Sequence, residues 1–409
     1  MKNPKLRFRS ADGSLFEDWK SVKVGDIAET CGGGTPATGN LSYWDGSIQW
    51  LTPTEINTKY VHASERTITQ QGLKNSSAKL LPKGAIVLTT RATLGACSIN
   101  NFEGDVCTNQ GFQSLIGKSS VDSEFLYYIV ASQRFQRELK KKASGSTFLE
   151  VSPSNLKKII VAIPSKQEQC RVADFFSTLD EKIALAERKL TALQTLKSGL
   201  MQKIFSREIR FKREDGSEYP EWKMMTLAQV VEGLQYGMNS AAIPFDGKHK
   251  YLRITDIDEV TNRFRGENVV SPQKEVENKY RLQEGDILFA RTGNSVGKTY
   301  LYDKEDGEVY FAGFLIRGHV VNSCNPYFIF LQTLGRRYRK WVNTTSMRSG
   351  QPGINAEEYG SFEIDLPCLE EQTRIATFFE NIDGKILCSR KKLKQLRSQK
   401  QAFLQQMFI

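Results

Sequence analysis

The feature that most constrains this chain is an internal repeat with a period of 203 residues. The segment "LRFRSADGSLFEDWK" (6–20) returns as "IRFKREDGSEYPEWK" (209–223). Further along, "IPSKQEQCRVADFFSTLDEKI" (163–183) returns as "LPCLEEQTRIATFFENIDGKI" (366–386), again 203 residues later. Two such periods account for almost all of the 409 residues, so the sequence predicts one structural unit built twice.

Between these matched ends the two copies diverge. The segment "LPKGAIVLTTRATLG" (81–95) corresponds to "LQEGDILFARTGNSVG" (282–297), and Gly111-Phe112 corresponds to Gly313-Phe314. Alternating apolar residues, β-branched side chains and Gly, Asn and Asp turns predict a mixed α+β lobe in each copy. The repeat therefore predicts two similar lobes whose loops differ.

The stretch "ILFARTGNSVGKTYL" (287–301) resembles a nucleotide-binding loop because it contains Gly297-Lys298-Thr299. A phosphate loop requires four residues between its glycines, whereas only three separate Gly293 from Gly297. The following residues read as a hairpin that turns at Asp306-Gly307, so the helix that would hold a phosphate is missing. The first copy, "IVLTTRATLGACS", keeps the arginine and the last glycine without the lysine. We therefore predict a strand and a polar turn at this place.

Composition narrows the class of protein. The chain has 57 Lys and Arg against 46 Asp and Glu, a net charge of +11 that favours a polyanionic partner without proving one. No stretch approaches the length of a membrane helix, and we expect a cytoplasmic protein. The three histidines have no ligand spacing that would indicate a metal site. We expect reduced, mostly buried thiols at all seven cysteines, which are Cys31, Cys97, Cys107, Cys170, Cys324, Cys368 and Cys388.

A long helix is predicted near the end of each copy, over 166–206 and 367–409. The first has a capping box, because Ser165 stands three residues before Glu168. Apolar residues in both segments step alternately by four and three, which is the seam of a coiled coil. The first seam comprises Val172, Phe176, Leu179, Ile183, Ala186, Leu190, Leu193, Lys197, Leu200 and Ile204. The second comprises Ile375, Phe379, Ile382, Ile386, Ser389, Leu393, Leu396, Lys400, Phe403 and Met407.

These seams need a partner, and the other copy in the same chain is the nearest one. Antiparallel pairing is expected, because parallel pairing would force the second lobe back along the whole rod. An ordinary bundle core or a homodimer zipper remains an alternative. Two similar lobes on a stiff rod correspond to a dimeric DNA reader whose half-sites are spaced along the duplex. Fusion of both halves in one chain allows each lobe to read a different half-site.

At this level of detail the chain resembles the specificity subunit of type I restriction-modification enzymes. The resemblance rests on the order and doubling of "IPSKQEQ" (163–169) and "LPCLEEQ" (366–372), each opening a long helix. It also rests on "GGGTPATGNLSYWDGSIQWLTPTEI" (32–56), which is similar to the opening of many target-recognition domains. The second lobe has "YGMNSAAIPFDGKHKYLRITDID" (236–258) instead, which implies a different half-site.

The resemblance implies target-recognition domains at 1–165 and 207–366, separated by spacer helices at 166–206 and 367–409 that form an antiparallel coiled coil. Each domain would read one half of a bipartite, asymmetric site in double-stranded DNA. Two methyltransferase (modification) subunits and the restriction/translocase subunits would be the partners. Adenine methylation and ATP-dependent cleavage would use their S-adenosylmethionine, ATP and Mg²⁺, so this chain would bind no cofactor. A coiled-coil scaffold that binds only proteins and a stand-alone nuclease are the competing hypotheses.

No catalytic residues are predicted in the chain itself. The nearest approach to an adenine methyltransferase signature is Asn325-Pro326-Tyr327-Phe328, which reads as a helix start. The acidic residues in 12–20 and 215–223 superficially suggest a metal-dependent nuclease. A glycine beside the first acid and a tryptophan after the second make an anchored turn the better interpretation.

Contacts with DNA are expected in the polar and glycine-rich loops, where Arg, Lys, Asn, Gln, Ser and Thr reach phosphates and base edges. Candidates in the first lobe are Thr35, Thr38, Asn40, Tyr43, Lys59, Arg91, Thr93 and Ser146. Candidates in the second lobe are Tyr236, Asn239, Lys250, Arg253, Arg291, Asn294, Ser295, Lys298, Arg348 and Gln351. The charge run "RKKLKQLRSQK" (390–400) is interpreted as a solvated helix face.

Overall fold

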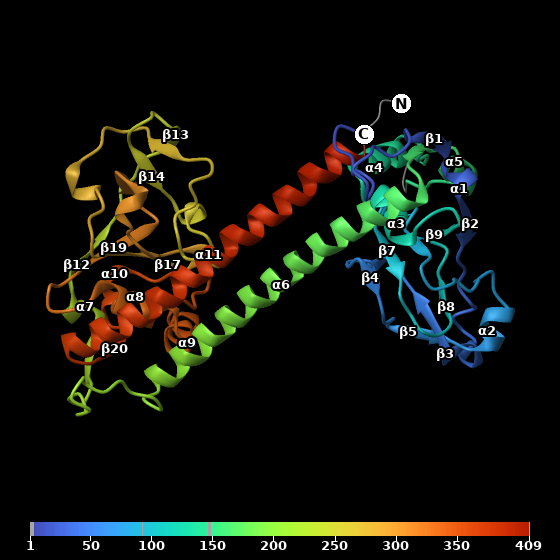
Figure 1. Ribbon diagram of the computed structural model, residues 1–409. Coiled ribbons are helices and arrows are strands. Elements are labelled where there is room, and N and C mark those ends of the chain that lie inside the picture. The colour runs from blue at the N-terminus through green and yellow to red at the C-terminus, as the bar shows by residue number, and fades with distance from the viewer. Residues whose placement is uncertain (1–3, 92, 146–148, 409) are drawn as a thin grey trace. The chain divides into compact units, whose positions relative to one another are not determined.

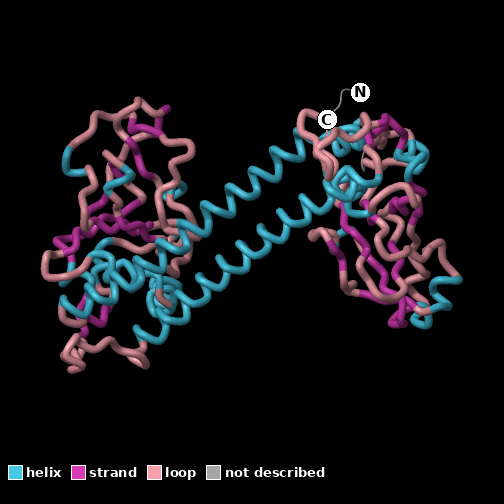
Figure 2. The backbone as a smooth tube through the Cα atoms, in the orientation of Figure 1, coloured by secondary structure: helices cyan, strands magenta, loops and turns pink. Residues whose placement is uncertain are grey.

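The chain folds into two compact units in the computed structural model, which describes residues 4–91, 93–145 and 149–408. Unit 1 comprises Met1–Arg188 and Arg390–Ile409, and unit 2 comprises Lys189–Ser389. Each unit therefore contains one lobe, the start of its own long helix and the end of the other (Figure 1). In each unit most helices gather beside the long helices, and strands and loops make up the rest of the lobe (Figure 2).

The main sheet of unit 1 has five strands in the order β2-β9-β6-β7-β4. These strands are β2 (Ala28–Gly32), β9 (Gln113–Gly117), β6 (Ile86–Leu88), β7 (Cys97–Asn100) and β4 (Tyr60–Val61). A second sheet joins β5 (Arg66–Ile68), β3 (Trp44–Leu51) and β8 (Val106–Thr108), in which β3 and β8 run parallel. The remaining strands β1 (Lys20–Lys23) and β10 (Ile160–Ile163) pair antiparallel.

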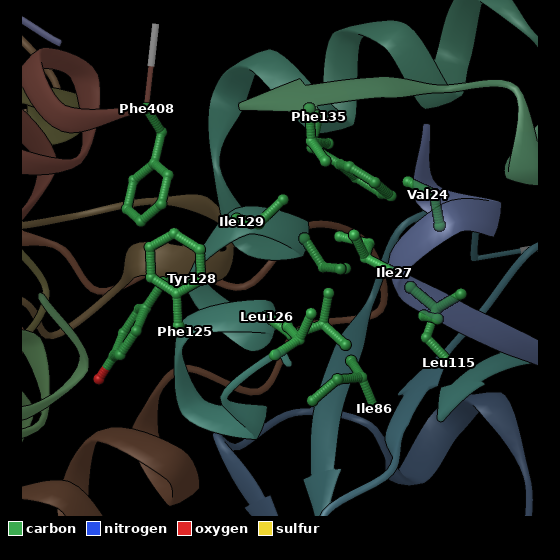
Figure 3. Close-up of a cluster of buried hydrophobic side chains, with 14 of the residues drawn as sticks. Val24, Ile27, Ile86, Leu115, Phe125, Leu126, Tyr128, Ile129, Phe135 and Phe408 are labelled. Carbon is green, nitrogen blue, oxygen red and sulfur yellow. The ribbon is translucent and has the colours of Figure 1, made fainter. Parts of the chain in front are cut away.

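Short helices cover this lobe and connect it to the long helix. They are α1 (Val24–Ile27), α2 (Gln70–Lys74), α3 (Ser123–Ala131), α4 (Gln133–Lys141), α5 (Pro153–Lys157) and the 3-10 turns η1 (Leu41–Tyr43) and η2 (Pro53–Glu55). Helix α3 packs its apolar face on the sheet, where Phe125 and Leu126 are fully buried. Figure 3 shows Phe125 next to Phe408, and the centres of their rings lie 5.7 Å apart. The core of the lobe therefore continues into the end of the second long helix.

Unit 2 repeats the same plan. Its main sheet has the order β12-β19-β16-β17, made of β12 (Val231–Tyr236), β19 (Leu315–Val320), β16 (Asp286–Ala290) and β17 (Thr299–Leu301). The other strand pairs are β11 (Lys223–Thr226) with β20 (Glu363–Leu366), β14 (Lys250–Leu252) with β18 (Val309–Phe311), and β13 (Ala242–Pro244) with β15 (Val270–Pro272). Its short helices are α7 (Leu227–Val230), α8 (Pro326–Leu334), α9 (Arg336–Thr345), α10 (Ala356–Gly360), η3 (Ile254–Asp256), η4 (Asn278–Tyr280), η5 (Gly293–Ser295) and η6 (Lys304–Asp306).

The predicted repeat is confirmed, and the structure corrects its alignment inside the lobes. The carbonyl of Thr90 accepts from Val151 N, and the carbonyl of Arg291 accepts from Ile354 N. Arg291 therefore occupies the place of Thr90, so pairing it with Arg91 was wrong by one residue. Matching Gly111-Phe112 with Gly313-Phe314 was wrong by one residue as well, because Phe112 bridges to Thr89 just as Leu315 pairs with Ala290. Since successive side chains of a strand face opposite ways, one residue of shift changes the face.

The long helices α6 (Lys166–Phe205) and α11 (Leu369–Met407) run antiparallel within each unit, as predicted. In unit 1, Asp180 Oδ1 lies 2.5 Å from Lys400 Nζ, and Glu187 Oε1 lies 2.6 Å from Arg397 Nη2. Residues further along α6 therefore contact residues earlier in α11, as antiparallel pairing requires. In unit 2, Lys197 Nζ lies 2.7 Å from Asp383 Oδ1. The polar seam lysines therefore have matched carboxylate partners that fix the register, and every seam residue is buried or half-buried.

A buried ion pair anchors the start of each long helix. Arg7 donates to Glu168 of α6 in unit 1, with Nη2 to Oε2 at 2.9 Å. In unit 2, Arg210 Nη2 donates to Glu371 of α11 at 3.1 Å. The side chains of both glutamates have no exposed surface. These hydrogen bonds raise the pKa of both arginines above its ordinary value, so each guanidinium stays charged.

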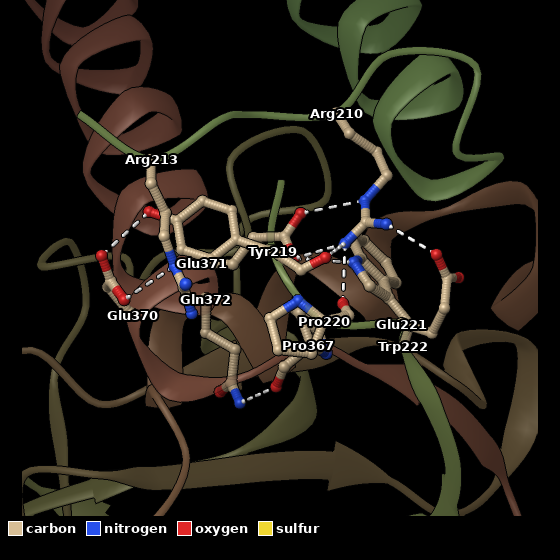
Figure 4. A network of polar contacts seen from close by, with 10 residues as sticks. All are labelled: Arg210, Arg213, Tyr219, Pro220, Glu221, Trp222, Pro367, Glu370, Glu371 and Gln372. Atoms are coloured by element: carbon tan, nitrogen blue, oxygen red, sulfur yellow. Dashed lines mark hydrogen bonds and ion pairs between the residues drawn. The ribbon is translucent and has the colours of Figure 1, made fainter. Parts of the chain in front are cut away.

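The surroundings of the second pair are drawn in Figure 4. Trp222 Nε1 donates to Glu371 Oε2 at 3.0 Å, and Arg210 also binds the carbonyl of Pro220 and the exposed Glu221. The neighbouring Gln372 donates to the carbonyl of Pro367 at 2.8 Å. The segment that precedes the lobe is thereby attached to the first turn of α11.

The predicted capping box at α6 forms only in part. Ser165 Oγ accepts from the Glu168 N–H at 3.4 Å, as a capping residue should. The Glu168 carboxylate binds Arg7 instead of completing the box at the Ser165 N–H. A glutamate three residues after a serine is a local signal, whereas its actual partner lies 161 residues away in sequence.

We predict that Arg210→Met destabilises the protein by about 3–5 kcal/mol, because it leaves a buried carboxylate without its cation. The loss should appear as a lower free energy of unfolding in urea. The control Glu221→Gln removes an exposed partner of the same arginine and should change little. Equal effects of both substitutions would contradict this assignment.

Candidate functional site

The loop between β16 and β17 connects two strands of one sheet and does not lead into a helix. Its central residues form η5, and β17 returns antiparallel to β16 with Ile287 opposite Leu301. The prediction of a strand and a polar turn is confirmed. The hairpin expected at Asp306-Gly307 is wrong, because β17 pairs with β16, and β18 pairs with β14 instead.

The backbone N–H groups of this loop are used inside the fold. Gly293 N donates to the carbonyl of Pro352 at 3.0 Å, and Gly297 N donates to Tyr359 Oη at 3.1 Å. The Tyr359 hydroxyl in turn donates to the carbonyl of Ala290 at 2.6 Å. Burial raises the pKa of Tyr359, so this hydroxyl keeps its proton. A phosphate cradle would need such N–H groups to point at a ligand.

Lys298 is also held internally. Its Nζ donates to the carbonyl of Ile257 at 2.9 Å and lies 3.7 Å from Glu259 Oε1. Only 13% of the side chain is exposed. This lysine fastens the loop to the preceding segment of the lobe, which leaves it poorly placed to reach a ligand.

Three predicted residues of unit 2 come together on one surface beside this loop. The Arg291 guanidinium carbon lies 4.8 Å from the centre of the Tyr236 ring. Tyr236 Oη accepts from Ala356 N at 3.1 Å, which fixes the ring at the end of β12. Gln351 approaches Gly293, where an added Cβ would lie 3.0 Å from its Nε2. We call Tyr236, Arg291 and Gln351 the unit 2 polar surface.

This surface offers directed donors on a firm backing. Stacking on an aromatic ring pre-orders an arginine, so less freedom is lost when it binds a planar acceptor. The backbone bridge between Thr292 and Gly353 joins the two loops that carry Arg291 and Gln351. Asn294 is exposed and Ser295 is half-buried on η5 of the same loop.

The other candidates of the second lobe do not join this surface. Arg253 donates to both carboxylate oxygens of Asp256 at 2.8 and 2.9 Å, and these bonds raise its pKa. Lys250 Nζ donates to the carbonyl of Asp306, while Asn239 is exposed in the loop after β12. Arg348 is exposed and binds the carbonyl of Thr345 at 2.8 Å together with Glu358.

In the first lobe, three candidates lie in loops that follow equivalent strands. Thr35 follows β2, and its hydroxyl donates to Gln110 Oε1. Arg91 and Thr93 follow β6 and are exposed, with Arg91 Nε 3.7 Å from Glu150 Oε2. The loop that begins at Thr90 is one residue shorter than the loop that begins at Arg291. In the shorter loop Gly95 N donates to the carbonyl of Thr89, and in the longer loop Gly297 N donates to the carbonyl of Ala290.

Lys59 is placed differently from the others. Its Nζ lies 2.5 Å from Glu124 Oε2 and 3.8 Å from Asp180 Oδ2, and it donates to Tyr128 Oη at 2.7 Å. With 13% of its side chain exposed, it connects β4 to α3 and α6. The structure therefore gives this lysine an internal role.

The remaining candidates of the first lobe serve mainly as loop residues. Asn40 caps η1, and its Oδ1 accepts from Ser42 N at 3.1 Å. Tyr43 is half-buried, and its carbonyl accepts from Thr69 N. Thr38 is exposed between β2 and η1. Ser146 lies outside the described residues.

Sequence reasoning missed two exposed side chains of unit 1. Gln110 is the partner of Thr35, and Arg66 places its guanidinium carbon 3.6 Å from the centre of the Trp44 ring. The spacing of Trp44 and Trp50 in one strand could have indicated an aromatic face. Nothing in the sequence indicated that β5 would place an arginine against it.

The described residues give little support to a methyltransferase, nuclease or metal site. Asn325 caps α8 by accepting from Phe328 N at 3.0 Å, with Pro326 at the first helical position, so the predicted helix start is confirmed. Gly13 and Gly216 form matching turns with φ of 85° and 83°, as expected. Among the described residues, no group of three His, Cys, Asp or Glu could hold a metal ion, and no helix could span a membrane.

The cysteines agree with expectation only in part. All seven are free thiols. Three are buried and Cys388 is exposed, while the other three are half-buried. Burial raises the pKa of Cys97 and of Cys107 to about 12, which makes these thiols unreactive.

Comparison with known proteins places both copies in one family. The model of the type I restriction modification DNA specificity domain matches residues 16–195 and again 219–398. The MjaIX specificity subunit of Methanocaldococcus jannaschii is 34% identical over 57% of this chain and 56% of its own length. The MjaVIII specificity subunit of the same organism is 22% identical over 95% of this chain and 91% of its length.

Solved structures share the fold. The crystal structure of a type I restriction-modification S subunit from M. genitalium has a TM-score of 0.62 at 16% identity, covering 100% of this chain and 99% of the other. A chain from a study of complex assembly in a type I system has a TM-score of 0.58 at 17% identity, covering 95% and 97%.

We predict that Gly297→Ala destabilises unit 2 by about 2–4 kcal/mol. Its φ of 81° disfavours a side chain, and an added Cβ would lie 2.5 Å from Val342 Cγ1. The control Gly350→Ala, where a Cβ meets nothing within 4 Å, should be tolerated. Thermal unfolding followed by circular dichroism measures both, and a tolerated alanine at 297 would refute the packing described.

Proposed function

This chain belongs to the type I restriction modification DNA specificity family, and we propose that its two units each read one half of a split, asymmetric DNA target. A specificity subunit is the non-catalytic member of such an enzyme. The proposal assigns target reading to the lobes at 1–165 and 207–366. The helices at 166–206 and 367–409 would set the spacing between the half-sites.

The observation that carries the proposal is the doubled family match on lobes whose loops differ. Four strands of the main sheet have the same order in both units, β2-β9-β6-β7 and β12-β19-β16-β17. In contrast, β13 and β15 of unit 2 pair with each other, whereas β4 and β5 of unit 1 join two separate sheets. A common scaffold with unlike loops suits two readers of unlike sequences. Loops on a rigid scaffold are where recognition residues concentrate.

The unit 2 polar surface has suitable chemistry for base reading. Arginine pairs with the O6 and N7 acceptors of guanine, and glutamine pairs with N6 and N7 of adenine. Arg291 and Gln351 supply these two groups on joined loops. In unit 1 the corresponding proposal is Thr35, Arg91 and Thr93, to which Gln110 and Arg66 are added.

Partner subunits would supply the chemistry. We propose that two methyltransferase subunits and the restriction/translocase subunits assemble on this chain, by analogy with the related chain solved in work on the assembly of a type I complex. S-adenosylmethionine, ATP and Mg²⁺ would be bound by those partners. A scaffold that binds only proteins is the alternative, and the net charge of +11 favours the DNA reader over it.

The direct test is to co-express the chain with a methyltransferase partner and map the methylated adenines. We expect a split motif with two fixed halves. Replacing residues 1–165 with the corresponding lobe of another specificity subunit should change one half and leave the other. A motif indifferent to the exchange, or no methylation at all, would overturn the proposal.

A single substitution tests the unit 2 polar surface. Arg291→Ala should reduce methylation through one half-site, because each bidentate base contact contributes about 1–3 kcal/mol of discrimination. The half-site assigned to unit 1 should stay unchanged. Lys304→Ala, at an exposed lysine of η6, is the matched control and should leave the motif intact. Equal methylation by both variants would remove Arg291 from the reading surface.

A further inference from the structure

Helix α9 of unit 2 carries a group of cations that the fold does not use. Arg336, Arg339 and Lys340 are all exposed. None forms an ion pair with a carboxylate within the described ranges. Their neighbour Arg337 differs, because it binds Glu363 at 2.9 Å and Asp365 at 2.7 Å.

These three cations line one open groove of about 620 Å³. The rest of its lining is neutral and comes from the end of α9 and from α6, including Asn343 and Gln202. Positions 336, 339 and 340 lie on one helix face, since neighbours three and four apart share a face. The groove is thus lined by positive charge and amide or hydroxyl groups, with no carboxylate among the residues that form it.

The fold offers no stabilising reason for these charges. Arg336 stands in the first turn of α9, where the helix dipole disfavours a cation. Three like charges in adjacent turns also repel one another. Cations that stand where the helix dipole and neighbouring like charges disfavour them, without a compensating contact, are candidates for binding an external group.

The repeat indicates what kind of partner fits. The equivalent helix α4 of unit 1 lines an equivalent groove with the end of α11, and the exposed cations Arg137 and Lys141 contribute to that lining together with Glu138. The individual residues are not kept, since Gln133 stands where α9 has Arg336. A protein bound identically by both units would favour the same side chains in both, as the helix seams do. Positive charge alone is what a phosphate backbone requires.

We propose that the groove formed by α9 and the end of α6 binds the phosphate backbone of duplex DNA outside the bases that are read. The proposal rests on the DNA-reading function proposed above. It assigns Arg336, Arg339 and Lys340 to sequence-independent affinity, whereas Arg291 and Gln351 are assigned to specificity. Helix α4 supplies the weaker counterpart in unit 1, where Glu138 lies beside Lys141 at 2.8 Å.

The test is salt-dependent binding of the full chain to a fluorescent 40-base-pair duplex of arbitrary sequence, followed by anisotropy. Neutralising the groove by Arg336→Gln, Arg339→Gln and Lys340→Gln should weaken binding by about tenfold or more. The slope of log affinity against log salt should become shallower by about 3, one unit for each phosphate that the groove no longer neutralises.

Two matched variants complete the design. Lys391→Gln, Lys392→Gln and Lys394→Gln remove the same charge from exposed positions of α11 and should leave the slope unchanged. Arg336→Lys with Arg339→Lys keeps the charge and should retain parental binding. Circular dichroism of all variants establishes that they are folded.

Three outcomes would overturn the proposal. One is an unchanged slope in the groove variant, and another is the same change in the α11 control. The third is loss of binding to a methyltransferase partner with the DNA slope intact, which would make the groove a protein-docking surface. Methylation mapping separates this proposal from the previous one, because the groove variant should methylate the same motif less efficiently.

Discussion

The buried ion pair at the start of each long helix is the interaction on which the architecture depends. Glu168 and Glu371 have fully buried side chains, and each is bound by an arginine 161 residues earlier in the chain. A buried carboxylate without its cation is strongly destabilising, so the segment before each lobe must return to the helix that follows it. The ion pair therefore holds the segment before each lobe against the first turn of the long helix that follows the lobe.

The contacts along the seams of α6 and α11 then determine the register in which the two helices pair. Lys197 pairs with Asp383 and Lys400 pairs with Asp180, so each seam lysine has a carboxylate partner on the other helix. A polar residue in an apolar seam specifies register because any other register leaves a charge unpaired. The lobes are free to differ, since the parts that hold the unit together lie in the sheet, the short helices and the seam.

The sequence did not reveal which partner each charged side chain binds, and this limited the prediction of the candidate site. Lys59, Lys298 and Arg253 stood in polar segments like the others, yet the fold binds them to its own carboxylates and carbonyls. Arg291 and Gln351 are 60 residues apart and become neighbours through the bridge between their loops. The free cations of α9 were overlooked, because sequence does not distinguish them from the ion-paired Arg337.

The sequence alone determined the repeat, the two lobes and the presence of a long helix in each copy, because periodicity and internal similarity are carried by residue order. Only the tertiary structure decided which loops lie together and that Arg291 corresponds to Thr90 instead of Arg91. It also decided which cations of α9 are left without an ion pair among the described residues. These depend on strand register and on partners distant in the chain. A shift of one residue reverses the face of a side chain without altering the pattern from which it was predicted.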